Sequence, residues 1–378
     1  MSSWALYFYA NGCKLAGYDK SHSAITDMLE SKGVQVNYHE DICNIDPNYD
    51  LVVYTPAINP TNVELAYAKE LQMPIVKRAE LLGMLCKGKF CIAVAGTHGK
   101  TSVTAMIANI LSESNIAFEA FVGGICKTVD SNLYKSDGAQ VVIVEADEYD
   151  RSFLNLKPDI AVVTSVSADH LEVYGSKEEL QKSFVQFMSS CRPSLRIVNG
   201  NYKDIFDTNV TYGFNEDAKY RIVDYNYVNG LANVVINDGV RDVKFENLPL
   251  RGKFNIENFC AAFAVASVLK CDYDKIACAT RKFKGVCRRF EIKFENERVT
   301  LIDDYAHHPE EINCLIEAIR EIYPDKKVCG VFQPHLFSRT QMFMDEFATV
   351  LSKFDEMYLL DIYPAREMPI EGVTSNAL

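Results

Sequence analysis

A glycine-rich turn between an apolar run and a helical segment is the feature that most limits how this chain can fold. Residues 96–102 read Gly-Thr-His-Gly-Lys-Thr-Ser; they follow the apolar run 90–95 and precede residues 103–111, which have helical periodicity. Flexible glycines let backbone N–H groups approach a phosphate, the start of a helix adds its positive dipole end, and the lysine adds a cation. The pattern therefore predicts a strand, a phosphate-binding loop and a helix inside an α/β domain.

We expect this loop to bind a nucleoside triphosphate. Lys100 is placed to contact the β and γ phosphate oxygens, and the Thr101 hydroxyl to reach a Mg²⁺ ion. The strict Walker pattern fails because Val94 stands where its first glycine belongs, so the loop is the short G-T-x-G-K-T variant. The predicted phosphate-binding residues are Gly96, Thr97, His98, Gly99, Lys100, Thr101 and Ser102.

Acidic and imidazole side chains follow two further apolar runs. Residues 141–144 end in Glu145, and residues 160–164 lead into an Asp-His pair that ends at His170. Because the carboxyl ends of parallel strands share one edge of an open sheet, we expect Glu145 and His170 to join Thr101 as metal ligands there. The alternatives are a structural histidine and a solvated acidic turn, which is the interpretation for Glu148 and Asp150.

The chain divides into three α/β parts by its strand, helix and turn patterns. In the first part Thr61 is predicted to cap a helix, and Glu64, three residues later, to complete its capping box. In the second part the stretch 220–245 alternates as antiparallel strands do, and residues 284–289 resemble a linker to the third. The predicted strands are 14–18, 34–38, 51–54, 74–76, 90–95, 141–144, 160–164, 196–198, 300–302, 327–332 and 357–360, and the predicted helices are 21–31, 61–71, 103–111, 256–269, 310–322 and 340–352.

Both ends of the chain depart from the pattern of a complete doubly wound domain. The chain opens in a helical segment instead of a strand and a Gly-rich turn, and the third part has only about ninety residues. We therefore expect roughly fifteen to twenty residues to be missing ahead of Met1 and several dozen beyond Leu378. The first and last domains would then be incomplete, and this chain could lack full activity.

Composition excludes several classes of protein. The chain has 39 basic and 51 acidic residues, a net charge of −12, which disfavours nucleic acid as a partner. No apolar run reaches the ~18 to 20 residues of a membrane span, so membrane insertion is not expected. The 12 cysteines form no Cys-x-x-Cys pair, which favours reduced thiols and a cytoplasmic location over a metal or disulfide framework. Nothing in the composition indicates the oligomeric state.

Taken in order, these motifs resemble the Mur ligase family. The likeness is carried by the loop at 96–102, the acidic run at 145–150, the Asp-His pair at 169–170 and the run Asp-Asp-Tyr-Ala-His-His-Pro at 303–309. The resemblance implies an α/β protein with three domains. These are a Rossmann-like UDP-sugar-binding domain at 1–87, a central P-loop ATPase domain at 88–287 and a Rossmann-like amino-acid-binding domain at 288–378.

The resemblance also implies roles for residues outside the loop. It places Asn255 and Asn258 near the adenine and Arg288 at the ATP, although an asparagine can equally cap a helix and an arginine can be a surface charge. Phe254 stands where a histidine is common, and Val185 where relatives carry a modified lysine, so no such modification is expected. The implied catalytic residues are Lys100, His307, His308 and Arg339.

The implied function is ATP-dependent ligation of L-alanine to the lactyl carboxylate of UDP-N-acetylmuramate in peptidoglycan precursor synthesis. ATP would phosphorylate the carboxylate, with Lys100 and Mg²⁺ neutralising charge, and the amine would capture the acyl phosphate. His307 or His308 could take the amine proton; His308 could instead only cap the following helix. The alternatives are a sister ligase that attaches a preformed peptide, a folate-type polyglutamate ligase, an ATPase without ligase activity and a binding-only protein.

Overall fold

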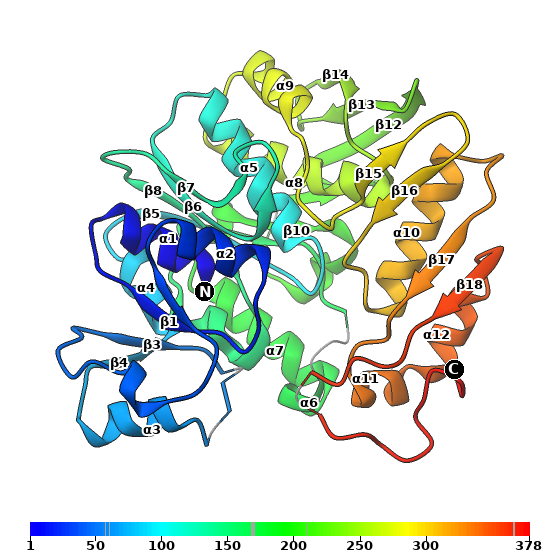
Figure 1. Cartoon of the computed structure of the whole chain (residues 1–378). Helices are drawn as coiled ribbons and strands as arrows, with labels where there is room; N and C mark the ends of the chain where they lie inside the picture. The colour runs from blue at the N-terminus through cyan, green and yellow to red at the C-terminus, as the bar shows by residue number, and fades with distance from the viewer. Residues whose placement is uncertain (57, 60, 168–170, 209, 366) are drawn as a thin grey trace.

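The computed structural model describes residues 1–56, 58–59, 61–167, 171–208, 210–365 and 367–378. Figure 1 shows a central region built on one large sheet, with the first region (blue) and the third region (orange to red) on different sides of it. The predicted α/β class with three domains is confirmed. Among the described residues, no helix is long and apolar enough to cross a membrane.

The central sheet has ten strands in the order β14-β13-β12-β11-β10-β9-β5-β8-β6-β7. Its middle is parallel, and it ends in antiparallel pairs at both edges, as predicted for the 220–245 edge. The strands are β5 (Phe90–Ala95), β6 (Phe118–Cys126), β7 (Ser131–Lys135), β8 (Val141–Ala146), β9 (Ile160–Val163), β10 (Arg196–Asn199), β11 (Val210–Gly213), β12 (Tyr220–Val228), β13 (Leu231–Asn237) and β14 (Asp242–Leu248).

Helices cover both faces of this sheet, which is why its central strands are apolar throughout. In β5, Ile92 and Val94 pack into one core, whereas Cys91, Ala93 and Ala95 pack into the other. The helices of the region are α5 (Lys100–Glu113), α6 (Leu171–Tyr174), α7 (Lys177–Ser189), α8 (Lys253–Val268) and α9 (Tyr273–Lys282), with short helical turns η2 (Tyr149–Asn155), η3 (Pro193–Leu195) and η4 (Gly200–Ile205).

The first region pairs its short strands two by two, β1 with β2 and β3 with β4, all parallel. The predicted cap of α3 is wrong: Asn62 caps the helix, and Glu64 instead accepts the backbone N–H of Asp41. The elements are α1 (Ser2–Ala10), β1 (Ala16–Tyr18), α2 (Ala24–Ser31), β2 (Gln35–Asn37), η1 (Ile42–Asn44), β3 (Val52–Tyr54), α3 (Val63–Glu70), β4 (Ile75–Lys77) and α4 (Arg78–Cys86).

The third region has a small core of its own, formed by α10 and α12 around Ile312, Ile316 and Phe347. The helix predicted at 340–352 is two helices, which meet at Phe343. The elements are β15 (Glu291–Glu295), β16 (Thr300–Asp303), α10 (Pro309–Ile322), β17 (Cys329–Phe332), α11 (Phe337–Met342), α12 (Met344–Leu351) and β18 (Glu356–Leu359). β15 is antiparallel to β16, and β17 is parallel to β18.

Candidate active site

The loop predicted at 96–102 connects β5 to α5 and lies against the end of β9. Gly96 and Gly99 have φ angles of 139° and 84°, which favour glycine, and a Cβ on Gly96 would lie 2.0 Å from the Thr164 hydroxyl. The Ser165 hydroxyl accepts the backbone N–H of His98 at 2.7 Å. Neighbouring strand ends therefore hold the loop in shape.

Lys100, the first residue of α5, makes a buried ion pair with Glu148. Its Nζ lies 2.7 and 3.0 Å from the two carboxylate oxygens and donates to the Gly96 carbonyl at 2.5 Å. Burial by itself would lower the pKa of Lys100, but the attraction of Glu148 and neighbouring carboxylates outweighs it and raises that pKa. The Glu148 side chain is 1% exposed, so the interpretation of Glu148 as part of a solvated turn is wrong.

Thr101 and Glu145 place two oxygens side by side beyond the lysine. The Thr101 hydroxyl donates to Glu145 Oε2 at 3.2 Å, and Glu145 Oε1 accepts the backbone N–H of Gly123. Burial raises the pKa of Glu145, and a cation beside it would favour its ionised form. A hydroxyl and a carboxylate so close together are donors that suit Mg²⁺. The predicted third ligand, His170, lies outside the described residues.

These residues line one cavity, which we call the loop cavity. All three regions contribute to its wall, because Trp4 comes from the first, Glu145 from the second and His307 from the third. Arg78 of the first region also donates to Asp147 of the second at 2.7 Å. The site residues that line the loop cavity are Thr97, His98, Gly99, Lys100, Thr101, Glu145, Asp147, Glu148, Arg289, His307 and Glu311.

A second cavity, which we call the α8 cavity, shares Gly99 with the loop cavity. Asn258 lines the α8 cavity, and its Oδ1 would lie 2.7 Å from a Cβ on Gly99. The Asn258 amide donates to Asn255 Oδ1 at 3.3 Å. Because Gly252 is the N-cap of α8, neither asparagine caps this helix. Phe254, Ser102 and Tyr212 also line the α8 cavity.

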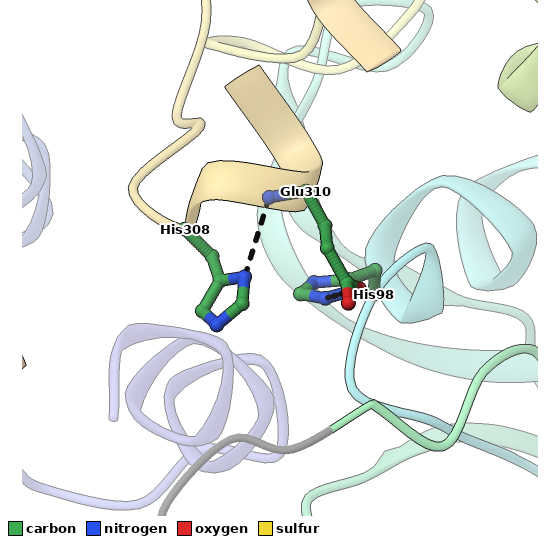
Figure 2. A group of neighbouring side chains, drawn as sticks. All are labelled: His98, His308 and Glu310. Carbon is green, nitrogen blue, oxygen red and sulfur yellow. Dashed lines mark hydrogen bonds and ion pairs between the residues drawn. The ribbon is translucent and has the colours of Figure 1, made fainter. Parts of the chain in front are cut away.

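The start of α10 brings the third region onto the phosphate loop. Glu311 accepts from His98 Nδ1 at 2.9 Å with one oxygen, and with the other from the backbone N–H of His307 at 2.9 Å. Burial would raise the pKa of Glu311, but the hydrogen bond and charge of His98 hold that pKa well below its usual range. His308 is the N-cap of α10, and its Nδ1 accepts the backbone N–H of Glu310 at 3.4 Å, as the capping alternative predicted (Figure 2).

The arginines of the third region differ in placement. Arg288 lies over the Tyr305 ring, with its guanidinium carbon 4.6 Å from the ring centre, and faces a cavity within the third region. Arg289 lines both the loop cavity and the α8 cavity. Arg339 is buried at the start of α11, with Nη1 3.5 Å from His335 Nδ1, and lines neither of these two cavities.

Three domain families match consecutive parts of the chain. Residues 1–90 match the Mur ligase family, catalytic domain, residues 94–266 the Mur ligase middle domain, and residues 288–377 the Mur ligase, glutamate ligase domain. A UDP-N-acetylmuramate--L-alanine ligase of Christiangramia forsetii is 44% identical over 99% of this chain and 84% of its own length. The chain belongs to the Mur ligase family. The likeness stated from the motifs is thereby confirmed.

Other Mur ligases show the same likeness in sequence and in structure. A relative from Flavobacterium johnsoniae with the same name is 44% identical over 100% of this chain and 84% of its length. The crystal structure of UDP-N-acetylmuramate-alanine ligase from Thermotoga maritima aligns with a TM-score of 0.85 and 28% identity, covering 96% of this chain and 83% of that one. This chain thus spans 84% of the length of each of the Christiangramia forsetii and Flavobacterium johnsoniae relatives, and the expected loss of segments at both ends stays a prediction.

The site of this Mur ligase includes residues that sequence reasoning missed. Glu148 pairs with Lys100, Gly123 donates to Glu145, and Thr164 and Ser165 hold the loop. The signal for Thr164 was present, because it stands at the carboxyl end of a predicted strand beside the loop strand. No local pattern marked Gly123, which lies within β6, a strand that was not predicted.

Proposed function

We propose that this chain joins L-alanine to the lactyl carboxylate of UDP-N-acetylmuramate with ATP as the energy source, in peptidoglycan precursor synthesis in the cytoplasm. The names of the 44% identical relatives support the two substrates. The geometric support is one observation: Lys100, Thr101 and Glu145 share a cavity whose wall comes from all three regions. The 12 cysteines are all free in the structure, which supports a reducing compartment.

In the first step a carboxylate oxygen of the sugar attacks the γ-phosphorus of ATP, and ADP leaves. The product is an acyl phosphate, whose carbonyl carbon is electrophilic. Lys100 carries the cation needed on the transferring phosphoryl group, and the loop amides hold the phosphates in line. We propose that the nucleoside extends from the loop into the α8 cavity, which Asn258 lines.

Mg²⁺ would be held by Thr101 and Glu145, with His170 proposed as a further ligand. The fit rests on the Thr101 hydroxyl and the Glu145 carboxylate, which lie 3.2 Å apart at the end of the loop. Such an ion neutralises phosphate charge when it is bound. The Glu145 carboxylate is oriented by the N–H of Gly123, so the protein presets this ligand.

In the second step the amine nitrogen of L-alanine attacks the acyl carbon, phosphate leaves, and the nitrogen loses a proton. His307 is favoured over His308 as the group that takes this proton. His307 Nδ1 lies 2.9 Å from the Tyr305 carbonyl, which only accepts, so the neutral ring carries its lone pair on Nε2. In His308 the Nδ1 lone pair accepts the backbone N–H of Glu310, and Nε2 then carries the proton of the neutral ring.

The test is phosphate release from ATP in the presence of UDP-N-acetylmuramate. We expect release that requires both the sugar nucleotide and an amino acid, with L-alanine preferred over glutamate and over a tripeptide. A preference for the tripeptide would contradict the proposed acceptor. ATP turnover that ignores the sugar nucleotide would indicate an ATPase without ligase activity.

A further inference from the structure

Glu148 is the most deeply buried charged group of the loop cavity. Its side chain is 1% exposed, and both of its oxygens lie within hydrogen-bond distance of Lys100 Nζ, at 2.7 and 3.0 Å. The Tyr174 hydroxyl also donates to the Glu148 carbonyl at 2.5 Å, which anchors the backbone of the turn. The lysine that the reaction needs is therefore occupied by a protein carboxylate.

The lysine cannot serve Glu148 and a triphosphate equally. A lysine ammonium has three N–H donors. In this structure Nζ lies within hydrogen-bond distance of the two Glu148 oxygens and the Gly96 carbonyl, and at 3.4 Å from the Thr97 carbonyl. A phosphate that reaches Lys100 must take donors away from Glu148, because a carboxylate and a phosphate both accept only.

The surrounding charges add to this competition. Four carboxylates line the loop cavity in the described part of the chain. The cationic side chains of this cavity are Arg78, which pairs with Asp147, Lys100, which pairs with Glu148, and Arg289. A nucleotide without a metal ion brings further negative charge to the same space. The carboxylates of the loop cavity are Glu145, Asp147, Glu148 and Glu311.

We propose that Glu148 is a positioning residue that holds Lys100 in place before the nucleotide binds and that sets how weakly a nucleotide without a metal ion is bound. This rests on the proposed use of ATP. In the free protein the Glu148 carboxylate neutralises the charge of the buried lysine. In the complex the nucleotide phosphates neutralise that charge instead. Removing the charge of Glu148 therefore destabilises the free protein more than the complex, and nucleotide binding becomes tighter.

The test is the dissociation constant of ADP, measured by calorimetry on the full chain with EDTA present. We expect Glu148→Gln to bind ADP about tenfold more tightly than the wild type, because an unpaired buried charge is costly and the phosphates relieve it. Glu148→Asp, which keeps the charge but shortens the side chain, should shift the affinity less in the same direction. The aspartate variant also keeps the proposal testable where the glutamine variant does not fold.

Two further variants separate the lysine pair from general electrostatics. In a Lys100→Met background, Glu148→Gln should no longer tighten ADP binding by the same factor, since the competed cation is gone. Asp150→Asn removes a neighbouring charge whose partner is the exposed Lys77, and it should leave ADP affinity unchanged. Equal tightening in either variant would overturn the assignment to Lys100.

Calorimetry with and without Mg²⁺ separates a wrong role for Glu148 from a wrong proposed function. If the wild type binds ADP with Mg²⁺ but Glu148→Gln does not bind ADP more tightly in EDTA, the inference is wrong and the function stands. If the wild type binds no ADP even with Mg²⁺, the proposed use of ATP is wrong, and the inference falls with it.

Discussion

Lys100 is a charged side chain that the fold buries, and its chemistry depends on that burial. It is 17% exposed and paired, so its ammonium stays protonated and close to the Gly96 carbonyl. A charge held in a site with little water interacts more strongly with a phosphate than the same charge at the surface. The residue is thus positioned before the substrate arrives.

Replacing this lysine should remove most of the activity. We expect Lys100→Met to lower the rate of phosphate release about 10² to 10³-fold, because a preorganised charge on the transferring group is lost. The control is Lys182→Met, on the exposed face of α7, whose partner Glu179 lies one turn away and whose loss should leave the rate unchanged. A Lys100→Met enzyme with wild-type rates would remove the loop from the mechanism.

Gly123 offers a test of the Glu145 ligand in which none of the proposed metal ligands is itself replaced. A Cβ at Gly123 would lie 2.6 Å from Glu145 Oε2, so Gly123→Ala must displace the carboxylate. We expect the Mg²⁺ concentration for half-maximal activity to rise about tenfold or more, as for other losses of a ligand's support. Gly17→Ala meets open space and is the matched control; an equal response in both variants would contradict the assignment.

At the scale of elements, the start of α10 couples a helix cap to the phosphate loop. Glu311 satisfies the backbone N–H of His307 at the helix start and also accepts from His98 in the loop. A carboxylate at a helix N-terminus is favoured by the helix dipole as well. One side chain therefore fixes α10 and joins the second and third regions.

Glu311→Gln should destabilise the protein by about 1 to 2 kcal/mol at pH 7. The folded-state pKa of Glu311 is lowered, so its charge stabilises the fold above the unfolded pKa of about 4.3, and this contribution is lost as pH falls toward the folded pKa. Denaturant titrations at pH 7 and at about pH 4 should show the difference shrinking in acid.

The control for this helix is Glu317→Gln. Glu317 lies on the same helix and accepts an exposed hydrogen bond from Asn313, so its replacement should change stability by less than about 0.5 kcal/mol. A pH-independent loss in the Glu311 variant would show that shape, and not charge, carries the effect.

At the scale of the whole molecule, Trp4, the single tryptophan of the chain, belongs to the first region and lines the loop cavity. Trp4 of α1 stacks on Phe121 of β6 with ring centres 4.2 Å apart. Trp4 is 5% exposed, so a substrate that enters the cavity or moves α1 must change the surroundings of its indole.

Tryptophan fluorescence should therefore report substrate binding. We expect saturable changes in emission on addition of Mg²⁺ and ATP or of UDP-N-acetylmuramate, since closure of the three regions would exclude water from the site. Trp4→Phe should abolish the signal while it keeps the stack on Phe121. Unchanged emission at nucleotide concentrations that calorimetry shows to be saturating would contradict a cavity shared by the three regions.

The local sequence determined the parts of this site that depend on neighbours along the chain. The bounds of β5 were predicted as observed, and α5, β8, β9 and the antiparallel edge were placed within a few residues. These predictions used local signals: the periodicity of apolar residues, the glycines of the loop, and a lysine followed by a hydroxyl residue. Strand, turn and helix can be predicted from such signals because each depends on adjacent residues. The three-domain arrangement followed from the order of such motifs.

Only the tertiary structure decided which side chains meet. In the folded chain Glu148 is buried against Lys100, and Arg289 lines the loop cavity. Glu311 contacts His98, and Asn62, not Thr61, caps α3. Each of these depends on segments that lie far apart in the sequence or on a choice between adjacent polar residues of similar propensity. Burial and ion pairing are properties of the packed chain, and no short window of residues carries them.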